Sequence, residues 1–161
     1  MDEVGIRTIE AQPTIAVRLE TTQAALKDVF DTQLPRVSAA LEDTGAIMVG
    51  PPFARYREFG PDRVDVEIGA PIAAVPAGLA AIAETPDGVI GASSLPAGEI
   101  AATVHEGPFD GLEATYDALA AWIAEQGRVA GMGPWEVYLT DPQRVPDPVD
   151  WLTEVVWPLD G

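Results

Sequence analysis

Glu136 is the residue whose setting is most suggestive of chemistry. It stands in the run WEVYL at residues 135–139, where large apolar side chains surround a single charge. In an extended strand this carboxylate would be at least partly desolvated, and a desolvated charge needs a partner. A cation supplied by a ligand could be that partner. The alternatives are that Glu136 faces solvent on an edge strand or pairs with Arg55.

Aromatic side chains would form the rest of such a site. Flat cationic molecules are held by stacking and cation–π contacts of about 0.5–2 kcal/mol each. Tyr138 shares a strand face with Glu136 by the two-residue period, and Tyr56 occupies the matching place in an earlier segment. These two are the best candidates for the wall of a ligand site. The sequence leaves open which faces are taken by Trp135, Phe53 and Trp151, and such residues more often belong to the core than to a ligand wall. Tyr116, on a predicted helix, is a further candidate that packs inward or reaches the cleft or solvent.

Other chemistries have little support in the residue inventory. The chain has no cysteine, which excludes disulfides and thiolate sites, and its only histidine, His105, has no metal-ligand spacing around it. We interpret His105 as an ordinary strand residue rather than a catalyst. Ser93 and Ser94 lack a nucleophile-elbow pattern, and the glycines form no phosphate loop. We therefore expect no metal and no cofactor.

The charge balance also limits the possible partners. Asp and Glu number 26 against nine Lys and Arg, a formal net charge of -17, which repels a nucleic-acid backbone and would steer cationic ligands favourably. No apolar run is long enough to span a membrane, and the N-terminal residues do not resemble a signal peptide. The expected location is the cytoplasm.

The first half of the chain predicts a strand, a helix and a hairpin. β-branched residues over 6–20 are typical of a strand, with an interruption at Pro13. Apolar residues recur every three or four positions over 24–41, which predicts a helix that Pro35 kinks or divides. The apolar period then becomes two, and turn residues at 60–62 join two strands into a hairpin.

The second half repeats this order of elements. We expect a strand at 99–105, a helix capped by Asp110 and ended by Gly127, and two strands at 135–139 and 151–157. The halves also agree in residue types, since Gly50, Pro52, Phe53 and Tyr56 align with Gly133, Pro134, Trp135 and Tyr138.

Such self-similarity predicts a duplicated unit. We expect one domain with repeat 1 at about residues 6–72, a connector at 73–97 that holds one or two short extended pieces, and repeat 2 at about 98–159. The alternative is two independent hairpins that both end in aromatic strands by chance. The predicted fold class is α+β, with two strand, helix, strand, strand repeats.

The second repeat resembles a known family. The strand IAATVHEGPFDGL, the helix ATYDALAAWIAEQG and above all the run GPWEVYLTDP followed by DWLTEVVWPL are similar to the GyrI-like (gyrase-inhibitor-like) small-molecule-binding domains. The same module is the effector-binding domain of multidrug-responsive transcription activators. The resemblance covers about Ile6 to Leu159 and is most specific in the last sixty residues.

The resemblance implies an architecture and a ligand class. It implies an antiparallel sheet whose two repeats are related by a pseudo-two-fold axis, with helices on one side and a ligand cleft between the repeats. Family ligands are lipophilic and often cationic aromatic compounds, with a buried glutamate as counter-ion. That position corresponds to Glu136, and its equivalent in the first repeat is Ala54.

Three functions follow from the resemblance. The leading hypothesis is a stand-alone binding protein, a sensor or scavenger of hydrophobic and often cationic aromatic molecules. The first alternative is a hydrolase of reactive cyclopropane-bearing compounds, in which Glu136 would activate water and Tyr138 would donate a hydrogen bond. The second alternative is a gyrase-modulating module that binds protein.

Overall fold

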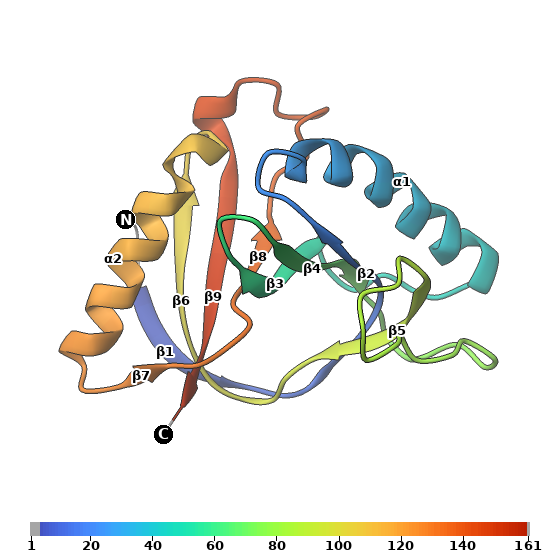
Figure 1. Cartoon of the computed structure of the whole chain (residues 1–161), viewed down its shortest axis with the longest axis horizontal. Helices are drawn as coiled ribbons and strands as arrows, with labels where there is room; N and C mark the ends of the chain where they lie inside the picture. Colours follow the sequence, from blue (N-terminus) through green and yellow to red (C-terminus); the bar gives the residue numbers. More distant parts are fainter. Residues whose placement is uncertain (1–3, 161) are drawn as a thin grey trace. The chain divides into compact units, whose positions relative to one another are not determined.

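The computed structural model describes residues 4–160, and its contacts divide the chain into two compact units (Figure 1). The N-terminal unit is Ala11–Pro96. The C-terminal unit consists of the residues up to Glu10 together with those from Ala97 onward. Each unit combines antiparallel strands with one α-helix, which confirms the predicted α+β class.

The N-terminal unit is a four-stranded antiparallel sheet with the order β3-β4-β2-β5. Its helix, α1, packs against β2 and β4. The core lies on the face toward this helix, where β-branched residues of the two central strands are fully buried. The elements in chain order are β2 (Gln12–Thr21), α1 (Leu26–Thr44), β3 (Phe53–Phe59), β4 (Val64–Pro71) and β5 (Ile90–Leu95).

The C-terminal unit has the sheet order β1-β6-β9-β8, with the short strand β7 also paired to β9. Its helix α2 covers one face through a core cluster that includes Leu119, Ile123, Ala101 and Val155 (Figure 1). The elements are β1 (Val4–Ile9), β6 (Gly98–Glu106), the 3-10 turn η1 (Phe109–Gly111), α2 (Leu112–Glu125), β7 (Val129–Ala130), β8 (Trp135–Tyr138), the 3-10 turn η2 (Pro148–Asp150) and β9 (Leu152–Asp160).

The two units share one topology. In the N-terminal unit the strand, helix, strand, strand order is β2, α1, β3 and β4, and in the C-terminal unit it is β6, α2, β8 and β9. Pairing is equivalent as well, because β4 lies between β3 and β2 just as β9 lies between β8 and β6. A fourth strand extends each sheet beyond this set, β5 beside β2 and β1 beside β6. The duplication, its pseudo-two-fold axis, the cleft and the repeat boundaries remain predictions.

Some local expectations differ from the structure. The strand predicted over residues 6–20 is two strands, and the first of them, β1, pairs with β6 of the C-terminal unit. The break falls between Ile9 and Gln12, while Pro13 lies inside β2. The helix α1 continues through Pro35 rather than dividing there. Asp110 does not cap α2, because a 3-10 turn precedes the helix and makes Gly111 its N-cap residue.

The ends of both helices agree with the sequence analysis. Gly45 adopts a positive φ of 73° and its N–H bonds the Leu41 carbonyl, which ends α1. Gly127, with a φ of 70°, comes one residue after Gln126, the C-cap of α2, and its N–H bonds the Ala124 carbonyl. No helix within residues 4–160 is long and apolar enough to cross a membrane.

Candidate functional site

Strand β8 carries the candidate acid. Glu136 pairs in register with Val155 of β9, and Tyr138 pairs with Thr153. Only 5% of Glu136 is exposed, so its carboxylate is desolvated as the sequence suggested. Because β8 alternates, Glu136 and Tyr138 lie on one face of the strand and Trp135 on the other.

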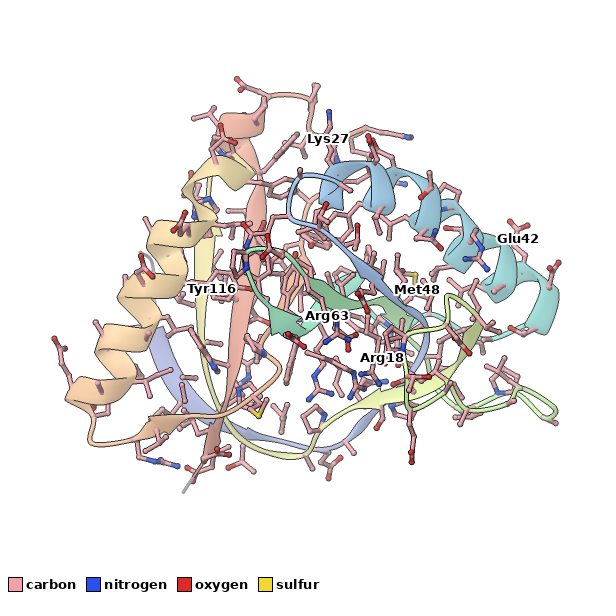
Figure 2. All side chains as sticks on the ribbon, viewed as in Figure 1. Arg18, Lys27, Glu42, Met48, Arg63 and Tyr116 are labelled. Carbon is pink, nitrogen blue, oxygen red and sulfur yellow. The ribbon has the colours of Figure 1, made fainter. Side chains whose placement is uncertain are left out.

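Two tyrosine hydroxyls hold the Glu136 carboxylate. Tyr116, on α2, donates a hydrogen bond to Oε1 at 2.9 Å. Tyr138, on the same strand as Glu136, donates to Oε2 at 2.8 Å. Figure 2 marks Tyr116 on α2, on the side of the helix that faces the sheet. Hydrogen bonds to an ionised group are about twice as strong as those between neutral groups. Both phenol hydroxyls are neutral donors, so these two bonds add no positive charge beside the carboxylate.

Aromatic rings lie around these tyrosines. Phe109 contacts Tyr138 at 5.8 Å between ring centroids and Trp151 at 5.0 Å. Tyr116 contacts Trp157 at 5.8 Å with an interplanar angle of 74°. Glu136 therefore stands among two tyrosines, two tryptophans and a phenylalanine that belong to the same unit.

Hydrogen bonds fix the two tryptophans. The indole N–H of Trp151 donates to the Val145 carbonyl at 2.6 Å, and that of Trp157 donates to the Gly131 carbonyl at 2.8 Å. Each ring is thus anchored at its polar end, which leaves its faces for packing. Phe109, which is 45% exposed, is a ring that the sequence analysis did not single out. The signal for it was its place between a Gly-Pro turn and a helix.

The other predicted wall residues have different surroundings. Trp135 is 3% exposed and faces away from the Glu136 side of the sheet. Phe53 is 1% exposed in the core of the N-terminal unit. Tyr56, also in that unit, pairs with Val66 and contacts Phe59 at 5.4 Å. A role of Phe53 or Tyr56 in ligand binding remains a prediction.

A second polar cluster, absent from the sequence analysis, lies on β2, β3, β4 and β5. Arg18 binds Asp65 through two hydrogen bonds of 2.9 and 2.7 Å, and these bonds raise the pKa of its guanidinium. Glu67 is fully buried, and its Oε1 accepts hydrogen bonds from the Arg57 guanidinium at 3.3 Å and from the Ser93 hydroxyl at 2.6 Å. Every one of these side chains has an oppositely charged or hydrogen-bonded partner, so the cluster reads as a structural ion-pair network.

Arg55 lies next to this network on β3 and is itself partly buried. Desolvation lowers the pKa of Arg55, and the nearby charge of Arg57 acts in the same direction. In the C-terminal unit, Glu154 lies on β9, the strand that is equivalent in order to β4, and it also pairs with an arginine, since Arg7 lies 3.4 Å away.

A hollow in the C-terminal unit is separate from the candidate site. Its lining comes from β1, β6 and β9 and includes Arg7, Thr103 and Glu154. None of its lining residues is aromatic, and Glu136 is not among them. Among the residues that the structure describes, no group of three His, Cys, Asp or Glu side chains is arranged to hold a metal ion.

The fold and this site define a class of protein. It is an α+β domain in which a buried carboxylate, solvated by two tyrosines, stands among aromatic rings, and such a site suits a small organic molecule better than a macromolecule.

Comparison with known proteins places the chain in a family. Residues 2–160 match the family model of the GyrI-like small molecule binding domain, and the chain belongs to that family. No protein among the curated ones matched it.

Solved structures show the same fold at low sequence identity. The C-terminal domain of EcmrR is 19% identical with a TM-score of 0.79, covering 98% of this chain and 97% of that domain. In the EcmrR–DNA complex the TM-score is 0.80 at 18% identity, and the match covers 98% of this chain but only 57% of the EcmrR chain.

Two further solved structures share this fold. SAV2435 bound to tetraphenylphosphonium is 12% identical with a TM-score of 0.64, over 99% of this chain and 94% of that one. A hydrolase encoded by lin2189 from Listeria innocua is 14% identical with a TM-score of 0.61, over 98% and 92%.

Proposed function

We propose that this chain binds lipophilic aromatic cations, with Glu136 as the counter-ion and Tyr116 and Tyr138 as its supports. The observation that carries the proposal is the buried carboxylate held by two phenol hydroxyls at 2.9 and 2.8 Å. In a site of low polarity, a buried carboxylate acts more strongly on a nearby cation than it would in water.

The surroundings of the carboxylate support the same ligand class. Tyrosine and tryptophan faces attract cations by about 0.5–2 kcal/mol each. The net charge of -17 raises the local concentration of cations and disfavours nucleic acid as a direct partner. One member of this fold, SAV2435, was solved bound to the aromatic cation tetraphenylphosphonium, which makes that cation a suitable probe.

The proposal predicts that Glu136→Gln weakens binding of tetraphenylphosphonium by about tenfold or more, equivalent to about 1.4 kcal/mol. Gln preserves the shape of the side chain and removes its charge. Binding of a neutral aromatic probe, triphenylphosphine oxide, should change by less than about twofold because it gains little from the charge. Isothermal titration calorimetry of both probes measures the difference.

Glu154→Gln is the matched control for this experiment. It removes the same charge from the neighbouring strand β9, where Glu154 pairs in register with Val137, on the face opposite to Glu136. Affinity for tetraphenylphosphonium should be close to that of the unsubstituted protein. Equal losses for the charged and the neutral probe in Glu136→Gln would remove the counter-ion role.

Hydrolysis of electrophilic cyclopropanes is a second candidate function. It is favoured by the pairing of a carboxylate with two O–H donors and by the likeness to a hydrolase of this fold. Glu136 would take a proton from water while the water oxygen bonds a ring carbon. The cyclopropane C–C bond breaks, and its electron pair passes to the ring carbon that carries the electron-withdrawing substituent. Tyr138 would turn its O–H from Glu136 to donate a hydrogen bond to that substituent, and the proton held by Glu136 would then pass to the ring carbon, which completes the addition of water.

Turnover separates the two candidates. If the chain is a hydrolase, incubation with an activated cyclopropane should give the ring-opened hydrate, and Glu136→Gln should lower its rate of formation at least about 100-fold, the usual contribution of a general base. Chromatography of the product measures this rate. Saturable binding of the compound with no product above the buffer rate would leave the binding function alone.

A further inference from the structure

His105 bridges strand β6 to the start of helix α2. Its side chain is buried, with 9% of the residue exposed. Nδ1 lies 2.7 Å from the Thr115 hydroxyl oxygen in the first turns of α2, and Nε2 lies 2.9 Å from the Pro108 carbonyl oxygen in the preceding loop. One imidazole therefore joins three consecutive elements of the C-terminal unit.

The chemistry of the two partners determines the state of the ring. A carbonyl oxygen only accepts, so Nε2 carries the proton that is donated to Pro108. Nδ1 is then the acceptor for the Thr115 hydroxyl. The competing acceptor for that hydroxyl is the Gly111 carbonyl at 3.5 Å, which is a much longer contact than 2.7 Å.

Both ends of the bridge lie next to residues of the candidate site. Pro108 directly precedes Phe109, whose ring contacts Tyr138 and Trp151. Thr115 directly precedes Tyr116, whose hydroxyl donates to Glu136.

We propose that His105 is a positioning residue of the ligand site, which holds Phe109 and Tyr116 against Tyr138 and Glu136 through its bonds to Pro108 and Thr115. This proposal rests on the proposed binding function, because it names the residue that holds the parts of that binding site in place. His105 acts through its neighbours, and none of its hydrogen bonds reaches Glu136.

The His105 ring packs closely against the start of α2 at Gly111. A Cβ added at Gly111 would lie 2.9 Å from Cε1 of His105, so the imidazole approaches the helix start as closely as a residue without a side chain allows. Loss of either hydrogen bond would leave a buried group without its partner and free the turn at 109–111. A ligand would then have to order that turn when it binds, which lowers its affinity.

The test uses a matched pair at Thr115. Thr115→Val keeps the shape and removes the hydroxyl, whereas Thr115→Ser keeps the hydroxyl. We expect Thr115→Val to weaken binding of tetraphenylphosphonium about five- to tenfold and Thr115→Ser to bind within about twofold of the unsubstituted protein, because one net hydrogen bond of about 1 kcal/mol is lost. His105→Ala should lose more, but it also leaves a cavity that could prevent folding.

Ile123→Val controls for general loss of stability. Ile123 is 1% exposed in the last turns of the same helix, and this substitution costs about 0.5–1.5 kcal/mol without touching the bridge. It should bind the probe nearly as well as the unsubstituted protein. A loss in Ile123→Val as large as that in Thr115→Val, or unchanged binding in Thr115→Val, would overturn the positioning role.

Near-ultraviolet circular dichroism of the ligand-free variants decides the proposal even if the probe does not bind. The spectrum reports the packing of aromatic rings, so Thr115→Val should alter it while Thr115→Ser should not. No change in Thr115→Val would refute the bridge itself. If the unsubstituted protein does not bind the probe but Thr115→Val alters the spectrum, the proposed function is refuted and the positioning of the rings by His105 is supported.

Discussion

Replacing Asp65 with alanine is expected to lower the free energy of unfolding by about 3–5 kcal/mol. Asp65 is 4% exposed, and its carboxylate accepts two of the hydrogen bonds of the Arg18 guanidinium, whose side chain is only 14% exposed and which also donates to the Glu84 carbonyl. Removal of one partner leaves the other charge buried and uncompensated in the middle of the N-terminal sheet. Urea unfolding followed by far-ultraviolet circular dichroism measures the loss.

Glu20→Ala is the matched control, since it also removes an acid that pairs with an arginine on the same sheet. The Glu20–Arg63 pair, 3.0 Å apart, is about half exposed on both sides, so solvent screens it and no change in the unfolding midpoint is expected. If Asp65→Ala unfolds at the same urea concentration as Glu20→Ala, the buried network does not stabilise the unit.

The order of the elements could be read from the sequence because it depends on local period. Alternation over Val64, Val66 and Ile68 gave a strand, and the three-to-four spacing through Leu119 and Ile123 gave a helix. Which sheet a strand joins depends on pairing between distant segments. The residues of β1 look the same whether they continue β2 or pair with β6, and only the backbone hydrogen bonds decide.

The candidate site was predictable where it lies on one strand. Glu136 and Tyr138 share a face by the two-residue period alone. Tyr116 could be named as a candidate, but its hydrogen bond to Glu136 depends on how α2 is rotated on the sheet. That rotation is set by packing and by the bridge from His105, a residue whose sequence context suggested nothing beyond an ordinary strand position.

Acids on equivalent strands of the two units differ in their partners. Glu67 on β4 and Glu154 on β9 are both paired with arginine. Glu136 on β8 is held by two tyrosines, whereas the residue aligned with it in the predicted first repeat, Ala54 on β3, is fully buried and uncharged. The predicted repeats therefore differ at the acid of the candidate site.

Leu119→Ala is expected to destabilise the C-terminal unit by about 2–5 kcal/mol and to reduce ligand binding with it. Leu119 is fully buried between α2 and the sheet, in contact with the cluster that contains Ala101 and Val155. It lies less than one turn after Tyr116, so the cavity loosens the part of the helix that supplies a hydroxyl to Glu136. Urea unfolding gives the stability, and calorimetry with tetraphenylphosphonium gives the affinity.

Leu139→Ala provides the comparison at a leucine that is 42% exposed. The same atoms are removed, but much of their surface already contacts water, so the cost should stay below about 1 kcal/mol. The ligand at saturating concentration should recover part of the loss in Leu119→Ala, because it binds only the folded form. Equal destabilisation by the two substitutions would mean that α2 is not held on the sheet by this core, and Tyr116 would then need another support.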